Sequence, residues 1–373
     1  DQHDRSADHR CSDHDDHHPD HDHHQRRELM VGGATIGATA DRLAQATSPP
    51  KPAERWFRAM NTDVHVVVLA ERDHDAFLDA AERTVHDHEA RWSRFLPNSE
   101  VSRLNAADGR PVVVSPDTFA LIGKAIDAWY LTGGAFDPTV GACLAAAGYD
   151  RSFEHLPLAE IADRPTSGHS PAATPRAVEL HEATTAVVAP PGVTIDLGGI
   201  AKGQSAETVV ADLLAAGALG CCVNIGGDLR VSGLPPDQRG WTVTLDCPGS
   251  GQVRAIALAD GAVCTSTITK RAWTAAGRRE HHLRDPGTGA ALATGLASVS
   301  VIAARADQAE VLTKAALAAG RDCAAQVLSA AGATGVLVTS DGVLLELEGF
   351  GPFRLDRSNE PRPAVPGTRG DRR

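Results

Sequence analysis

The sequence predicts a protein of the α+β class, with mixed or antiparallel sheets. Three observations indicate it: long amphipathic helices, short strands paired through glycine turns, and no regular strand–helix–strand alternation. The chain has 373 residues, enough to bury a large core in one domain or two lobes. Hydrophobic residues make up 42 % and charged residues 23 %, which is ordinary for a globular protein.

The folded part is expected to begin near Arg55, after a linker at 44–54 that is rich in Ser, Pro, Lys and Ala. Residues 63–70 predict a strand that places on one face Val64, Val66 and Val68. Residues 74–92 predict an amphipathic helix, whose apolar stripe contains Phe77, Ala81, Val85 and Trp92.

Residues 115–134 carry clear signals for a helix. Ser115 is a good N-cap, Pro116 suits the first turn, and Gly133–Gly134 end the helix. Its predicted core residues are Phe119, Ile122, Ile126 and Trp129. By contrast, residues 156–192 have little periodicity and predict a surface insertion or a loose link between lobes.

The second half of the chain alternates between strands and helices. Helices are expected at 205–218 and 308–319, followed by a further short helix. The expected strands are 221–225, 228–233, 241–246, 253–260 and 298–304, with a closing hairpin around Asp341–Gly342.

The charge of the chain argues against nucleic acid as a partner. The net charge is −12, and no basic stripe stands out. The first 24 residues hold eight Asp, two Arg and eight of the 17 His, so this segment is expected to be a disordered tail. A His-rich tract can bind transition metals, but a solvated tail is the simpler interpretation. The predicted organisation is a tail and linker at 1–54, a folded domain at 55–353 and a disordered tail at 354–373.

No stretch of 18 apolar residues occurs, so no integral membrane span is expected. The stretch at 25–40 has paired arginines before a short apolar run and resembles a weak twin-arginine export signal. That run is poor in Leu, which favours a cytoplasmic location over export. The seven cysteines are irregularly spaced without a C-x-x-C pair, which predicts reduced thiols and no zinc site.

The segment TIDLGGIAKG, residues 194–203, is the first candidate for chemistry. Gly198–Gly199 allow a ligand to approach the backbone closely, and the helix expected from Ser205 directs its free N–H groups toward an anion. Lys202 adds a positive charge for a phosphate, and Asp196 can accept hydrogen bonds. The alternative is an ordinary strand-to-helix turn, because the spacing matches neither a P-loop nor G-x-G-x-x-G.

Nine segments besides IDLGGIAKG also carry polar residues in short patterns. The ten segments are, in chain order, AMNTDVHVVV, RWSRFLPNSEVSRLN, GGAFDPTVG, GYDRSF, IDLGGIAKG, VNIGGDLRV, TSTITKRAW, HHLRDPGTG, AEVLTKAALAAG and GVLV with a following DG. Each alone is a weak signal. Together, in this order and spacing from Arg55 to Gly349, they resemble the FAD:protein FMN transferases of the ApbE type.

The resemblance implies an α+β fold with a flavin cleft between two lobes. It implies an enzyme that transfers FMN from FAD to a Ser or Thr hydroxyl of an acceptor flavoprotein and releases AMP. A magnesium ion on the FAD pyrophosphate is the implied cofactor. Positioning the phosphates and neutralising their developing charge would then carry the reaction.

The resemblance also assigns residues. His282 and Asp285 match the catalytic loop, and His281 is expected to face away as a structural neighbour. Glu310 and the Gly199 carbonyl match metal ligands. The positions that match contacts to FAD are Met60, Ala135, Phe136, Asp137, Asp196, Lys202 and Thr288.

One departure from the family pattern concerns the metal. Where the family carries Asp and then Thr four residues on, this chain has Glu310 and Lys314, and an ammonium repels a cation. The pair also suits an ordinary i,i+4 contact, and Asp307 with Glu310 resembles a capping box. Three alternatives follow: a metal held by Glu310, Gly199 and the pyrophosphate; Lys314 in place of the metal; or FAD binding with poor transfer.

Besides a His-rich metal carrier, which rests only on the tail, two rival functions stay open at this point. One is a metal-dependent FAD pyrophosphatase that yields FMN and AMP. The other is a protein that binds FAD without chemistry, which the Lys314 departure favours.

Overall fold

The structure is a computed structural model, and it describes residues 50–156, 174–237, 240–275 and 277–355. The predicted tails, apart from Arg354 and Leu355, lie outside these residues, as do the twin-arginine-like stretch at 25–40 and most of the linker. Among the described helices, none combines the length and apolar character needed to cross a membrane.

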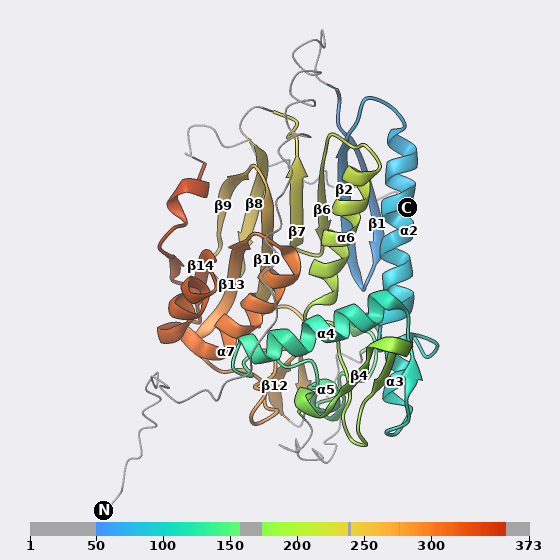
Figure 1. Ribbon diagram of the computed structural model, residues 1–373. Coiled ribbons are helices and arrows are strands. Elements are labelled where there is room, and N and C mark those ends of the chain that lie inside the picture. The colour runs from blue at the N-terminus through green and yellow to red at the C-terminus, as the bar shows by residue number, and fades with distance from the viewer. Residues whose placement is uncertain (1–49, 157–173, 238–239, 276, 356–373) are drawn as a thin grey trace, which may run out of the picture. The chain divides into compact units, whose positions relative to one another are not determined.

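An antiparallel sheet of eight strands is at the centre of the fold (Figure 1). Each strand pairs antiparallel with its neighbours, which confirms the α+β class and the antiparallel sheets. In sheet order the strands are β1 (Ala53–Ala59), β2 (Thr62–Leu69), β6 (Gly220–Ile225), β7 (Asp228–Gly233), β10 (Gly261–Thr267), β13 (Leu296–Ala303), β14 (Thr334–Thr339) and β15 (Leu344–Glu346).

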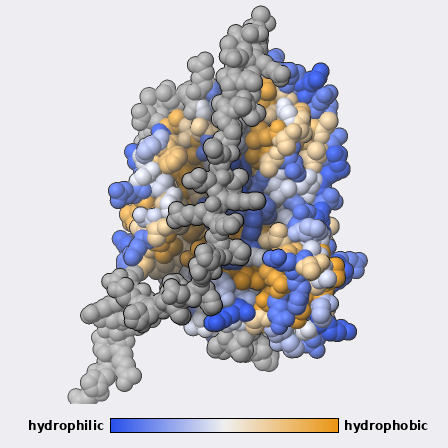
Figure 2. Space-filling view, viewed as in Figure 1, coloured by the Kyte–Doolittle hydropathy of each residue, from blue (hydrophilic) through white to orange (hydrophobic). Residues whose placement is uncertain are grey.

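Three helices cover one face of this sheet: α2 (His74–Trp92), α6 (Ala201–Ala215) and α7 (Ala306–Ala330) (Figure 1). Their apolar residues share a core with the sheet, in which Val64, Val66 and Val68 are fully buried as predicted. The outer side of α2, at the right of the view, is mostly hydrophilic (Figure 2). A hairpin of β8 (Trp241–Cys247) and β9 (Gln252–Leu258) contributes to a separate core with β7, β13 and β14.

A second group of elements forms its own apolar core. It contains α3 (Glu100–Asn105), α4 (Pro116–Leu131) and a small sheet in the order β3 (Val112–Val113), β5 (Ala186–Val188), β4 (Glu179–His181). The expected loose insertion at 156–192 is therefore wrong for 179–188, where Val187 is fully buried. The remaining elements are α5 (Gly141–Ala146) and the pair β11 (Ala272–Ala275) and β12 (Arg278–His281).

Helix starts were predicted with mixed success. In α4 the Ser115 side chain accepts from the Thr118 amide, as its N-cap role requires. Its buried face is centred on Leu121, Ile122 and Ala125. Helix α6 begins at Ala201 rather than Ser205, so Lys202 lies in its first turn. The two helices expected after 308 form one element, α7, with a kink at Gly320.

The cysteine expectation needs one correction. Within the described residues, Cys143, Cys221, Cys222, Cys247 and Cys264 are free thiols. Cys323, however, is disulfide-bonded, so the prediction of reduced thiols fails at that position.

Candidate functional site

The site is organised around the close crossing of α6 and α7. A Cβ on Gly203 would overlap the Ala306 carbonyl and lie 2.8 Å from the Asp307 nitrogen, so only glycine allows this approach. Gly203 lies in the first turn of α6, where an N–H has no acceptor within the helix. Its N–H donates instead to Glu310 Oε2 at 2.8 Å. The crossing therefore brings a buried carboxylate of α7 against the N-terminus of α6.

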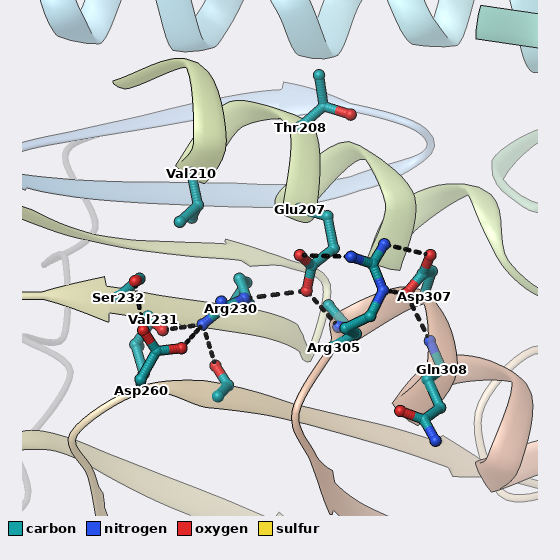
Figure 3. Close-up of polar contacts among 12 residues, drawn as sticks. Glu207, Thr208, Val210, Arg230, Val231, Ser232, Asp260, Arg305, Asp307 and Gln308 are labelled. Atoms are coloured by element: carbon teal, nitrogen blue, oxygen red, sulfur yellow. Dashed lines mark hydrogen bonds and ion pairs between the residues drawn. The ribbon is translucent and has the colours of Figure 1, made fainter. Parts of the chain in front are cut away.

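An ion-pair network fixes the start of α7 (Figure 3). Glu207 of α6 accepts the Ala306 amide at 2.6 Å, and its carboxylate also lies 3.0 Å from Arg230 Nε of β7. Arg305 pairs with Asp307 at 2.7 Å in the same network. These contacts join α6, β7 and α7, so residues one and two turns further along α7 have fixed positions.

The predicted capping box at this helix start is wrong. The N-cap is Arg305, which makes no side-chain cap, and Asp307 lies inside the helix. Asp307 instead pairs with Arg305 and with Lys124 of α4 at 3.0 Å, while Glu310 points to α6. The expected i,i+4 contact is present, since Lys314 Nζ lies 3.2 Å from Glu310 Oε1.

Two carboxylates and two ammonium groups form a buried cluster at the crossing. Lys202 Nζ contacts Glu310 Oε1, lies 2.9 Å from Asp228 Oδ2 and donates to the Gly198 carbonyl at 3.4 Å. Glu310 is fully buried and Asp228 is 3 % exposed, whereas the Lys202 and Lys314 side chains are 15 % and 16 % exposed. The two lysine side chains are thus the more exposed members of the cluster.

The charges of the cluster depend on one another. Burial opposes ionisation of Glu310, but Lys202 and Lys314 outweigh it and lower its pKa to about 2. Burial likewise opposes the Lys202 charge, but Asp228 and Glu310 raise the Lys202 pKa above its usual value. Burial raises the pKa of Asp228, and its Oδ1 has no partner among the described residues.

His282 follows β12 and has an uncommitted ring nitrogen. Its Nδ1 is buried without a partner among the described residues. Burial lowers the His282 pKa well below the usual value, and the charges of Arg271 and Lys314 lower it further. His281, by contrast, donates through Nε2 to the Leu292 carbonyl at 3.0 Å, and its Nδ1 accepts from the Leu283 amide.

The segment TIDLGGIAKG forms a constrained turn before α6. Asp196 Oδ1 accepts from the Gly198 amide at 2.8 Å, and its Oδ2 lies 2.8 Å from Arg94 Nε. The Asn105 side chain donates to the Ile195 carbonyl and accepts from the Ile195 amide, each at 2.8 Å. Asp196 therefore holds the turn through contacts within the protein.

Phe136 packs against this turn. A Cβ on Gly199 would lie 2.8 Å from Phe136 Cε2, so the predicted FAD residue and the predicted metal residue are direct neighbours. Ala135 lies beside them in the loop that follows α4, where its amide donates to the Thr132 carbonyl at 3.1 Å. Asp137 Oδ1 accepts from the amide and the hydroxyl of Thr139, each at 2.6 Å.

Asp285 and Thr288 meet in a single turn after His282. Asp285 Oδ1 accepts from the Thr288 amide at 2.7 Å and from its hydroxyl at 3.0 Å. The Gly289 amide closes the turn on the Asp285 carbonyl at 2.7 Å. Asp285 thus shapes the loop that carries Thr288, which is exposed.

Met60 lies in the turn between β1 and β2. Met60 and Asn61 both have positive φ, of 51° and 56°, as the tight hairpin requires. The Ser205 hydroxyl contacts Met60 Sδ at 3.8 Å and His88 Nδ1 at 3.0 Å. Met60 packs against both the central core and the α4 core.

Three site residues were not identified from the sequence as site residues: Asp228, Arg94 and Arg271. Asp228 lies in VNIGGDLRV, whose Gly-Gly-Asp pattern was noticed without a role for the aspartate. Its link to Lys202 joins β7 to α6, and no sequence spacing reveals such a contact.

The arrangement does not fit a magnesium site. Both oxygens of Glu310 face cationic or N–H donors, from Lys202, Lys314 and Gly203. Nowhere in the described ranges do three His, Cys, Asp or Glu side chains form a group able to hold a metal ion. A divalent cation would have to displace ammonium groups before it reached this carboxylate.

The fold and the site define a protein with an α+β core and a cluster of two carboxylates and two ammonium groups beside a glycine turn. The chain matches the ApbE family over residues 60–338 and belongs to this family. The resemblance seen in its motifs is confirmed.

Named relatives and solved structures agree with this assignment. The FAD:protein FMN transferase of Rhodobacter capsulatus is 30 % identical over 331 residues, which are 85 % of this chain and 62 % of the relative. That of Treponema pallidum is 32 % identical over 252 residues, which are 61 % of this chain and 67 % of the relative. The chain therefore spans about two thirds of the length of these two relatives.

A crystal structure of the ApbE protein from Thermotoga maritima superposes with a TM-score of 0.72 at 29 % identity, covering 82 % of this chain and all of that one. The flavin transferase ApbE of Vibrio cholerae shares the fold, with a TM-score of 0.68 at 23 % identity.

Proposed function

We propose that this chain is an FAD:protein FMN transferase. It transfers FMN from FAD to a Ser or Thr hydroxyl of an acceptor flavoprotein and releases AMP. The proposal is supported by membership of the ApbE family and by the names of the relatives. The observation that carries it in this chain is His282 Nδ1, which has no partner among the described residues and experiences the charges of Arg271, Lys314 and Lys202.

In the proposed transfer, each bond that forms is matched by one that breaks. The acceptor oxygen attacks the phosphorus on the FMN side of the pyrophosphate, and the bond from that phosphorus to the bridging oxygen breaks. AMP leaves with the bridging oxygen. The acceptor proton passes to His282 Nδ1, which is neutral at neutral pH because burial lowers the pKa of His282. The three cations offset the negative charge of the phosphates.

The other assigned residues would position the substrate. Lys202 and the turn held by Asp196 would contact the phosphates, since the amides of the first turn of α6 favour an anion. Phe136 with Ala135 and Asp137, and Met60 from the β1–β2 turn, would contact the rest of FAD. Asp285 would hold Thr288 against the nucleotide through the turn they share.

The test of this function is a direct transfer assay. The purified chain is incubated with FAD and a desalted lysate of its source organism, and in-gel flavin fluorescence and AMP are measured. A fluorescent acceptor band and AMP are expected with the native chain. Both should fall at least about tenfold in His282→Gln, because proton transfer contributes that much or more. The matched control is His86→Gln, since this histidine is exposed on α2.

The same assay separates the rival reactions. AMP without a labelled acceptor would indicate a pyrophosphatase, and bound FAD with neither product would indicate a binding protein. The transferase proposal fails in either case.

A further inference from the structure

We infer that Lys314 supplies the positive charge at the FAD pyrophosphate that a divalent cation would otherwise provide, so flavin transfer by this chain needs no magnesium. The inference rests on the proposed function and specifies how its phosphate site is neutralised. Three observations support it: the contacts that Glu310 makes, the hydrogen bonds that occupy the Thr313 hydroxyl, and the exposure of the Lys314 side chain.

Glu310 is already neutralised inside the protein. Its Oε1 contacts the ammonium groups of Lys202 and Lys314, and its Oε2 accepts from the Gly203 amide at 2.8 Å. The carboxylate is fully buried, so no face of it is open to solvent. Magnesium gives up its waters reluctantly and binds oxygen ligands in a near-ideal octahedron, which this surrounding does not offer.

The neighbouring hydroxyl does not replace the missing ligand. Thr313 precedes Lys314 on α7, but its Oγ1 donates to the Glu310 carbonyl at 2.7 Å and lies 2.6 Å from Ser266 Oγ. Thr313 is fully buried. Its hydroxyl is therefore committed to the interior between α7 and β10.

The Lys314 side chain is the more exposed partner of its ion pair with Glu310. Its side chain is 16 % exposed, while the Glu310 partner on the preceding turn is not exposed at all. Its charge acts on His282 together with those of Arg271 and Lys202. Glu310 thus holds the ammonium of Lys314, and the charge of that ammonium also acts on the imidazole assigned to proton transfer.

Asp228 is the remaining carboxylate that could bind a metal. Its Oδ2 lies 2.9 Å from Lys202 Nζ, but its Oδ1 has no partner among the described residues. A single carboxylate can hold magnesium together with substrate phosphates and waters. The test therefore includes an Asp228→Asn variant, as the control for magnesium binding through Asp228.

The first arm measures transfer in EDTA and in saturating magnesium, with FAD and the acceptor band found above. The native chain should label the acceptor and release AMP equally in both conditions. Lys314→Thr should lose at least about tenfold in EDTA, because it removes a charge-assisted contact to phosphate. Magnesium should restore part of that loss, since the added hydroxyl can ligate a cation. Lys124→Thr is the matched control, because Lys124 pairs with Asp307 outside the site.

The second arm needs no transfer activity. The FAD dissociation constant is measured by flavin fluorescence in EDTA and in magnesium, and bound Mn²⁺ is counted by electron paramagnetic resonance on the FAD complex. The native complex should bind FAD equally in both conditions and hold no Mn²⁺ tightly. Lys314→Thr should bind FAD more weakly in EDTA and should gain an Mn²⁺ site.

Magnesium-dependent transfer by the native chain, or one Mn²⁺ per native FAD complex that is not bound without FAD, would overturn the inference. Loss of that Mn²⁺ in Asp228→Asn would identify the ligand responsible. Failure of the proposed function looks different. The acceptor would stay unlabelled in every condition, with or without AMP release, while the FAD and Mn²⁺ titrations would still decide the role of Lys314.

Discussion

The Gly203 amide donates to Glu310 Oε2 at 2.8 Å across the crossing of α6 and α7. This bond joins the segment TIDLGGIAKG to the helix that carries Lys314. It exists because Gly203 has no side chain to keep the helices apart. The geometry of the site therefore depends on a helix–helix contact as much as on the polar residues themselves.

Gly203→Ala should destabilise the fold. The added methyl would overlap the Ala306 carbonyl, which is backbone and cannot turn aside. We expect a loss of about 1–3 kcal/mol in the free energy of unfolding, typical of overpacking, measured by urea denaturation. The matched control is Gly123→Ala in α4, where the new Cβ meets only Leu180 Cδ1 at 3.6 Å. Equal stability of Gly203→Ala and the native chain would refute the close crossing.

His88 should make the fold sensitive to mild acid. Burial, with the charge of Arg91, lowers the pKa of His88 from 6.5 to about 4. Between these values the unfolded chain binds a proton that the folded chain does not, so stability falls as the pH falls from 6.5 toward 4. The loss from this group at about pH 5 should be about 2 kcal/mol.

The measurement is the difference in urea stability between neutral and mildly acidic buffer, for the native chain and for His88→Gln. In the variant, the free energy of unfolding should fall less on acidification, because the contribution of His88 is missing. This holds whatever the stability of the variant at neutral pH. An identical acid loss in both proteins would show that His88 is not buried in neutral form. The exposed His86→Gln should retain the full acid loss.

Arg94→Met should weaken FAD binding. Arg94 and Asp196 are 10 % and 13 % exposed and lie 2.8 Å apart, so removal of the guanidinium leaves a nearly buried carboxylate without its cation. We expect an affinity about tenfold lower, because Asp196 holds the turn before α6. Flavin fluorescence titration measures it, with Arg103→Met as the exposed control. Unchanged affinity would mean that Asp196 does not position the ligand.

Local signals in the sequence predicted local structure well. Ser115 and Pro116 predicted the start of α4, and the turn between 225 and 228 predicted the β6–β7 hairpin. The start of α6 was missed because its N-cap, Ile200, makes no side-chain cap. The strands at 179–188 were missed because three-residue strands depend on their partners rather than on their own periodicity.

The site shows the same division. The contact between Glu310 and Lys314 follows from helical spacing and was predictable. The contacts of Lys202 with Asp228 and Glu310 join three elements that are distant in sequence, so only the folded chain reveals them. The neutralised state of Glu310, which argues against the expected magnesium ion, could not be inferred from residue types alone.

The most direct test of the account is the mass of the acceptor after reaction. The chain is incubated with FAD and the purified acceptor, and the intact acceptor mass and free AMP are measured together. A transferase should add the mass of one FMN less one water to a Ser or Thr of the acceptor, with one AMP released for each acceptor modified. AMP release with an unmodified acceptor, or no AMP at all, would contradict it.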